Sequence, residues 1–307
     1  MTRRVCVSVW ASLLVVLAGA SLPAQQIFRA GADVVMLNVT VTDRDGQFVS
    51  GLERSDFQVF EDGALQEISN FTRDQQPIAL SLVLDTSTSM EKGLPIAQEA
   101  AIGFARRLGP KDVAQILGFN KAVEKLQDFT GDRAALETAI RRTHAGGSTS
   151  LYNAVYTALD DLKRAIARTP DEIRRQSVVV LSDGEDTSSL VDYEAVMDSA
   201  KRSASSVYTI ALRPRESGTP RGFNEADFVL RTLAQDSGGR TYRVEDVAQL
   251  PAIYLQISDE LANQYTVGYT SKNPKRDGAW RRIVVKITRP TTSTRTKSGY
   301  YAPTATR

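Results

Sequence analysis

The hydrophobic pattern divides the chain into three zones with different periods. From residue 33 to residue 71, apolar and polar positions alternate in short runs between glycine-containing turns. Such alternation is typical of half-buried strands. It predicts strands at Val34–Val41, Phe57–Phe60 and Ile68–Phe71, with turns at Asp43–Gly46 and Glu61–Gly63 and at most one helical turn at Leu52–Asp56.

The second zone begins at Pro77, where strands start to alternate with helices. Ile78–Leu84 is an almost continuous apolar run, which is typical of a strand covered on both faces. Further strands are predicted at Val113–Phe119, Ser177–Leu181, Val207–Leu212 and Arg240–Val244, and helices at Ile96–Leu108, Ala134–Arg142, Leu151–Ala167, Tyr193–Ser203, Ala226–Gln235 and Val247–Gln264. Strands separated by helices of this length indicate parallel crossover units. The fold class is therefore α/β, with a doubly wound, mostly parallel, Rossmann-like sheet and helices on both faces.

The third zone returns to alternating strands, predicted at Tyr265–Thr270, Trp280–Thr288 and Arg295–Tyr301. Three strands on either side of the α/β zone are too few to form a good core alone. We therefore expect segments 25–76 and 263–307 to combine into one small β-sandwich-like domain, with an α/β domain at 77–262 between them.

The first 24 residues have the pattern of a signal peptide. Arg3 and Arg4 precede an apolar run, Val5–Ala20, and small residues offer cleavage sites up to Ala24. The run is shorter than the roughly 20 apolar residues that cross a bilayer, which disfavours an uncleaved anchor. The prediction is an exported protein, periplasmic or secreted, with no membrane span after cleavage.

Charge, cysteine and histidine content exclude several classes of function. The chain has 38 basic and 36 acidic residues, and loss of Arg3 and Arg4 would make them equal, so no basic excess points to nucleic acid. Its one cysteine, Cys6, would leave with the signal, which excludes disulfides and thiolate metal sites in the mature chain. His144 is the sole histidine, so a histidine-rich metal site is impossible.

Oxygen-bearing side chains gather after the predicted strands. Asp85–Ser89 follows the apolar strand, Gly146–Ser150 opens a helix, and Ser182–Asp186 follows the strand at Ser177–Leu181. We expect the strands that end before Asp85 and Asp183 to be neighbours where the winding of the sheet reverses, which is where open α/β sheets bind ligands. Carboxylates and hydroxyls converging there suit a hard cation such as Mg²⁺.

Asp85-Thr86-Ser87-Thr88-Ser89, Thr149 within its loop, and Ser182-Asp183-Gly184 together resemble the metal-ion-dependent adhesion site of von Willebrand factor type A (VWA) domains. The resemblance covers about residues 77–262. It implies a complete ligand set for Mg²⁺, or for Mn²⁺ or Ca²⁺: Asp85, Ser87, Ser89, Thr149 and Asp183, acting directly or through water. It also implies a protein partner whose Asp or Glu fills the open position on the metal. More loosely, the flanks resemble exported bacterial VWFA-related proteins of the acidobacterial type.

The predicted function is a non-enzymatic, cation-dependent module for protein–protein interaction or adhesion. One alternative is a structural component of an envelope assembly in which the metal only stabilises the fold. Another is a metal-assisted hydrolase, disfavoured because Ser87 stands where an aspartyl phosphatase usually has its second carboxylate and because no phosphate-binding glycine loop is present. Taken alone, Asp85 and Ser87 could also be helix caps. Glu185 and Asp186 lie next to the site and could tune it electrostatically, but they are interpreted as solvated loop carboxylates.

Overall fold

The computed structural model describes residues 34–168, 174–183, 186–212 and 225–304. All of them belong to one compact unit, Asp33–Arg307. The predicted signal peptide at 1–24 and Glu185 lie outside the described residues. No helix among the described residues is both long and apolar enough to cross a membrane.

The centre of the fold is a six-stranded sheet with the order β10-β9-β8-β5-β6-β7. Its strands are β5 (Ile78–Asp85), β6 (Val113–Phe119), β7 (Val123–Thr130), β8 (Arg175–Ser182), β9 (Ser206–Leu212) and β10 (Thr241–Val244). All neighbours pair in parallel except β6 and β7, which are antiparallel. Every residue of β5 is buried, as expected for a strand covered on both faces. The doubly wound, mostly parallel sheet predicted from the sequence is confirmed.

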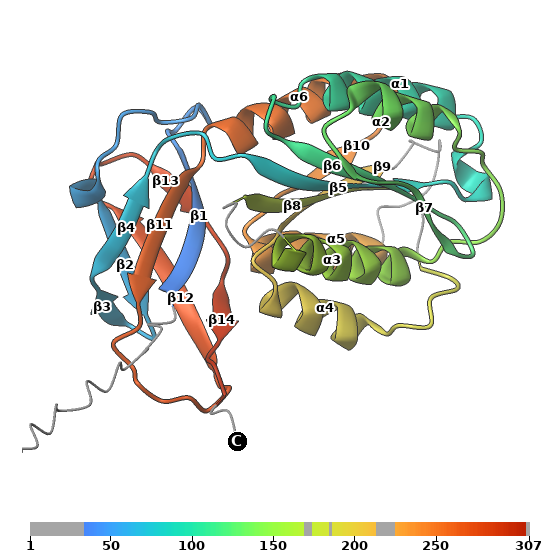
Figure 1. Cartoon of the computed structure of the whole chain (residues 1–307). Coiled ribbons are helices and arrows are strands. Elements are labelled where there is room, and N and C mark those ends of the chain that lie inside the picture. Colours follow the sequence, from blue (N-terminus) through green and yellow to red (C-terminus); the bar gives the residue numbers. More distant parts are fainter. Residues whose placement is uncertain (1–33, 169–173, 184–185, 213–224, 305–307) are drawn as a thin grey trace, which may run out of the picture. The chain divides into compact units, whose positions relative to one another are not determined.

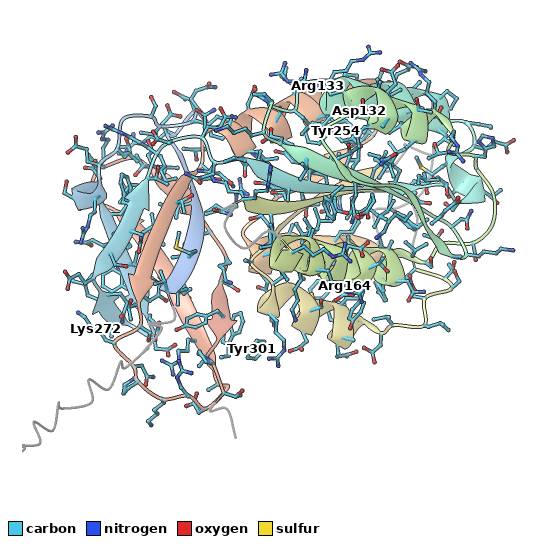
Figure 2. The ribbon with its side chains drawn as sticks, in the orientation of Figure 1. Asp132, Arg133, Arg164, Tyr254, Lys272 and Tyr301 are labelled. Carbon is cyan, nitrogen blue, oxygen red and sulfur yellow. The ribbon has the colours of Figure 1, made fainter. Side chains whose placement is uncertain are left out.

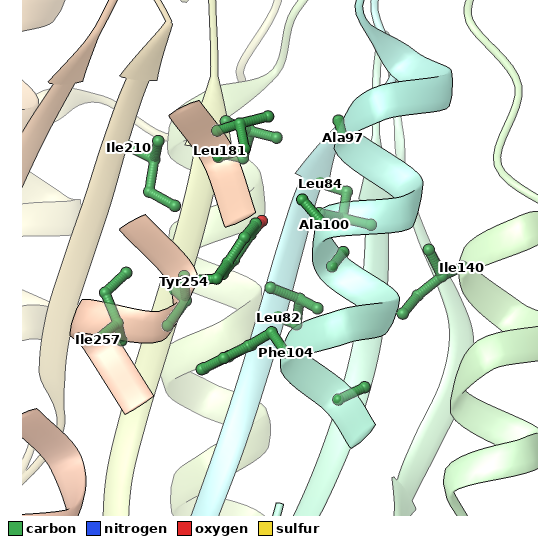
Figure 3. Close-up of a cluster of buried hydrophobic side chains, with 14 of the residues drawn as sticks. Leu82, Leu84, Ala97, Ala100, Phe104, Ile140, Leu181, Ile210, Tyr254 and Ile257 are labelled. Carbon is green, nitrogen blue, oxygen red and sulfur yellow. The ribbon is translucent and has the colours of Figure 1, made fainter. Parts of the chain in front are cut away.

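Helices cover both faces of this sheet (Figure 1). One face carries α1 (Leu94–Arg106), α2 (Arg133–Arg141) and α6 (Leu250–Ala262), and the other α3 (Leu151–Arg168), α4 (Tyr193–Arg202) and α5 (Glu225–Ser237). Side chains of β5 alternate between the two cores: Leu82 and Leu84 face α1 and α6, whereas Val83 faces α3. Figure 3 shows the first of these cores, where Phe104 and Tyr254 pack with ring centroids 5.1 Å apart.

Aspartate side chains fix where two of the surface helices begin. Asp132 precedes α2 (Figure 2). Its carboxylate accepts hydrogen bonds from the N–H groups of Ala134 and Ala135. Asp192 precedes α4, and its carboxylate accepts a hydrogen bond from the N–H of Ala195. These caps satisfy N–H groups that have no partner within the helix.

The flanking strands form two further four-stranded sheets with the orders β13-β1-β11-β4 and β14-β12-β2-β3. Their strands are β1 (Val34–Thr42), β2 (Phe57–Glu61), β3 (Ala64–Gln66), β4 (Ile68–Thr72), β11 (Tyr265–Thr270), β12 (Trp280–Ile287), β13 (Ser293–Arg295) and β14 (Gly299–Tyr301); a short 3-10 helix, η1 (Arg54–Asp56), precedes β2. Each sheet contains strands from both ends of the chain, with Val34 opposite Thr270 in one and Glu61 opposite Ile283 in the other. A third core, with Leu37 and Val267 at its centre, lies among these strands.

Some elements differ from the sequence-based predictions. The strands β3 and β7 were not predicted. The single strand expected at Arg295–Tyr301 is two short strands, β13 and β14, which belong to different sheets because the chain crosses between them. The helix expected from Val247 begins as a 3-10 turn, η3 (Val247–Gln249), and becomes α-helical only at Leu250.

A buried polar network joins α6 to the flanking strands. Glu260 is 1% exposed and accepts hydrogen bonds from the hydroxyls of Thr40 (3.2 Å) and Tyr208 (2.7 Å). Its other oxygen lies 2.6 Å from Nη2 of Arg295. These contacts hold the end of α6 against β1 and β13.

Candidate functional site

The candidate site is built on the carboxyl ends of β5 and β8, which are adjacent strands in parallel register. Asp85 is the last residue of β5 and is fully buried. One oxygen of its carboxylate accepts a hydrogen bond from Oγ of Ser182 (2.6 Å), and the other accepts one from the N–H of Ser87 (2.8 Å). The expectation that the strands preceding Asp85 and Asp183 are neighbours is therefore confirmed.

Hydroxyl groups link the two predicted carboxylates. Oγ of Ser87 lies 3.0 Å from Oγ of Ser89, and Ser89 in turn donates to Oδ1 of Asp183 at 2.8 Å. Ser89 lies in a short 3-10 helix, η2 (Thr88–Met90), which turns its side chain back toward the ends of the strands. Because the N–H of Ser87 also donates to Asp85, the residues Asp85, Ser87, Ser89 and Asp183 form one hydrogen-bonded group.

The loop that carries Thr149 is held beside this group by its backbone. Gly147 has a φ of +85°, a conformation that favours glycine, and its carbonyl accepts hydrogen bonds from both the N–H and the hydroxyl of Thr88 (each 3.1 Å). Gly146 donates to the carbonyl of Thr86 at 2.8 Å. Thr149 is 6% exposed, and among the described contacts its hydroxyl makes no hydrogen bond with the other four predicted residues. The loops meet, but Thr149 is not part of the hydrogen-bonded chain.

The electrostatics of the group favour a cation. Burial raises the pKa of Asp85, and the nearby charge of Asp183 adds to this, whereas hydrogen bonds from Ser182 and Ser87 act in the opposite direction. No lysine or arginine of the described residues forms an ion pair with Asp85. A buried carboxylate beside a second carboxylate is costly unless a positive charge compensates both.

The donor chemistry fits a hard divalent ion. The predicted set offers two carboxylates and three hydroxyls, all of them oxygen donors of the kind that Mg²⁺ prefers. In the described parts of the chain, no three His, Cys, Asp or Glu side chains form a metal-binding cluster. A metal at this position would therefore depend on hydroxyls and waters as well as on Asp85 and Asp183.

Two residues near the site have contacts that were not predicted from the sequence. Ser182 belongs to the motif, but its hydrogen bond to Asp85 was not predicted. The interpretation of Asp186 as a solvated carboxylate is wrong, because Asp186 is partly buried and accepts hydrogen bonds from the N–H of Tyr152 (3.1 Å) and the hydroxyl of Ser189 (2.6 Å). An acidic residue followed by a run of hydroxyl residues was the available signal, since such side chains commonly bond to nearby backbone N–H groups.

Comparison with known families agrees with this architecture. A model of the von Willebrand factor type A domain matches residues 80–256, which is more than half of the 307-residue chain. The chain therefore belongs to the VWA domain family. VWA domains typically mediate protein–protein interaction or adhesion, commonly bind a divalent metal at the adhesion site, and are generally binding or structural modules rather than enzymes.

Mycobacterial proteins are among those with a similar sequence. A UPF0353 protein of Mycobacterium tuberculosis is 26% identical over 225 residues, and one of Mycolicibacterium gilvum is 27% identical over 217 residues. Each match covers 64% of this chain and 64% of the relative, so the chain spans less than two thirds of the relatives' length. Among solved structures, a von Willebrand factor type A protein from Catenulispora acidiphila has a TM-score of 0.52 at 12% identity, covering 90% of this chain and 76% of that one. This likeness shows the shared fold alone.

Proposed function

We propose that this protein is an exported binding module that holds a divalent cation, Mg²⁺ in the first instance, and uses it to bind the carboxylate of a protein partner. The observation that carries the proposal is the fully buried Asp85, which forms no ion pair with a lysine or arginine among the described residues. Asp85 is connected to Asp183 through the N–H of Ser87 and the hydroxyls of Ser87 and Ser89. A metal bound by Asp85, Ser87, Ser89, Thr149 and Asp183 would neutralise the two carboxylates.

The small number of carboxylates explains why a partner would be attracted. The two carboxylates carry just enough formal negative charge to match a divalent ion, and the hydroxyl ligands add none. A bound Mg²⁺ would keep a strong affinity for a further anionic oxygen, which the Asp or Glu of a partner supplies. The residues of this chain position and partly dehydrate the ion, and we assign them no role in bond cleavage.

We also propose that residues 77–262 form the binding domain and that segments 25–76 and 263–307 form a β-sandwich-like domain that supports it. The mixed origin of the strands in both flanking sheets supports this division. Export is supported by the signal-peptide pattern of residues 1–24. Fractionation of cells that express the full chain, followed by mass measurement of its N-terminus, tests export and cleavage near Ala24 together.

The decisive experiment is calorimetric titration of Mg²⁺ and Mn²⁺ into chelator-treated protein. We expect one site per chain in the wild type and loss of binding in Asp183→Asn, a change that keeps the shape of the side chain but removes its charge. Asp198→Asn is the matched control, since Asp198 lies on α4 and pairs with Arg202 on the surface. Equal metal binding by wild type and Asp183→Asn would refute the proposed site.

A second step tests the partner. Immobilised full-length protein should retain a binding partner from the extracellular or envelope fraction in Mg²⁺ and release it in chelator. Retention by Asp85→Ala in the presence of chelator would show that the interaction does not use the metal.

A further inference from the structure

Leu190 is the most exposed large apolar side chain in the described part of the chain. It is 95% exposed, whereas the other large apolar side chains on the surface range from 40% for Leu255 to 52% for Leu65. Single apolar residues on a surface are common, but an almost complete lack of contacts is unusual for leucine. Its position relative to the candidate site therefore becomes important.

Leu190 lies on the loop that borders the candidate metal site. The N–H groups of Thr187 and Ser188 donate to the carbonyl of Thr149 at 2.8 and 3.1 Å, and the hydroxyls of Ser148 and Ser188 are 3.0 Å apart. Two residues of extended chain span about 7 Å, so the Cα atom of Leu190 lies within that distance of the Cα atom of Ser188. A partner that reaches the metal would also meet this loop.

The backbone at Leu190 is held on both sides by α3. Oδ1 of Asn153 accepts hydrogen bonds from the N–H groups of Leu190 and Val191, each at 3.1 Å. The hydroxyl of Ser189 accepts one from the N–H of Asn153 at 3.0 Å and donates to Asp186 at 2.6 Å. The backbone of the loop is thus fixed in place while the leucine side chain is exposed, so little backbone conformational entropy remains to be lost when a partner binds.

We propose that Leu190 is a specificity contact for the partner: the bound segment carries an apolar side chain close in sequence to the acidic residue that reaches the metal. This inference rests on the proposed function, because the metal supplies the attraction for the carboxylate. Charge complementarity selects an acidic segment, and Leu190 selects among acidic segments for those that can cover it. Partial burial of a leucine side chain corresponds to about tenfold in affinity.

A displayed peptide library tests the proposal with the full-length protein. Each peptide contains one fixed glutamate with randomised residues on either side, and selection is carried out in Mg²⁺ with elution by chelator. We expect enrichment of apolar residues at one position near the glutamate. Affinity for the selected peptides should fall about tenfold in Leu190→Ser and stay unchanged in Leu255→Ser, a matched change on the exposed face of α6.

The possible outcomes separate the two proposals. If no peptide binds in a Mg²⁺-dependent manner, both the proposed function and the role of Leu190 are refuted. If Mg²⁺-dependent peptides are selected without apolar enrichment, and bind Leu190→Ser as tightly as wild type, only the role of Leu190 is refuted. Because the Leu190 side chain makes almost no contacts, the melting temperature of Leu190→Ser should equal that of the wild type.

Discussion

Tyr254 provides a sharp test of how polar groups contribute to this fold. Its side chain is 1% exposed and packs against Phe104 in the core between α1 and α6, and its hydroxyl has no hydrogen-bond partner among the described residues (Figure 3). Burial accordingly raises the pKa of this phenol. The change Tyr254→Phe removes the hydroxyl and keeps the ring.

The expected result is a more stable protein. A buried polar group without a partner costs about 1–3 kcal/mol, whereas the dispersion contacts of one oxygen atom contribute only a few tenths of a kcal/mol. Tyr254→Phe should therefore raise the free energy of unfolding by about 1 kcal/mol, which in a domain of this size corresponds to about 2–4 °C in melting temperature. Differential scanning calorimetry of the metal-free chain measures the shift.

Tyr208 is the matched control. It is also fully buried, but its hydroxyl donates to Glu260 at 2.7 Å and accepts from Nε2 of Gln264 at 3.0 Å. Tyr208→Phe leaves the Glu260 carboxylate with one bond fewer, so we expect a loss of about 2–3 kcal/mol. If Tyr254→Phe lowers the melting temperature by as much as Tyr208→Phe, the hydroxyl of Tyr254 has a stabilising partner and the reasoning is wrong.

Three further predictions concern burial and close packing. Burial lowers the pKa of Lys297 to about 8, so the free energy of unfolding of the wild type should rise with pH between about 8 and 10.5. Lys297→Met should remove this rise and should increase the free energy of unfolding at pH 7 by at most about 3 kcal/mol. Denaturant unfolding across this pH range measures both effects. A Cβ atom at Gly239 would lie 2.0 Å from the carbonyl oxygen of Val207, so Gly239→Ala should strongly destabilise the protein. Gly103 lies on α1 with open space around it, so Gly103→Ala should stabilise the protein by about 0.5–1 kcal/mol. Equal melting temperatures for the two variants would contradict the packing argument. Arg175 is buried and donates to the carbonyls of Leu261 and Gln264, at and just after the end of α6, rather than to a carboxylate in the described chain. Lysine lacks the planar set of donors of arginine, so Arg175→Lys should lower the free energy of unfolding by about 2–4 kcal/mol, as measured by chemical denaturation.

The central sheet was predictable because its strands are covered on both faces. An almost unbroken apolar run such as Ile78–Leu84, with helical patterns on either side of it, is typical of a strand in a covered parallel sheet and of little else. The strand β7 gave no such signal, because it lies at the edge of the sheet and none of its eight residues is buried. Likewise, β3 has three residues, too few for a period to be recognised.

The candidate site was partly predictable for a related reason. Residues that follow buried strands must converge at one edge of a parallel sheet, so the grouping of Asp85 with Asp183 follows from topology. The contacts of Glu260 with Thr40 and Arg295 follow from no local pattern, since these residues lie far apart in the sequence. The identity of the five ligands is still a prediction, and the titration with Asp183→Asn tests it.

The interleaving of strands from the two ends of the chain affects the order in which the protein can fold. β1 has β11 on one side and β13 on the other, and Glu61 accepts a hydrogen bond from Tyr300, which is 239 positions away. As the polypeptide is synthesised from its N-terminus, β1 and β4 emerge long before the strands with which they pair, and β2, although β3 follows it directly, emerges long before β12. Until then their edges remain open to other chains, which is a known hazard for aggregation. The segment between them contains every strand of the central sheet, so that sheet does not depend on the C-terminal strands. We therefore expect truncation just before β11 to leave β1 and β4 without partners and one edge of β2 open, and to produce aggregation, even though the central sheet is complete.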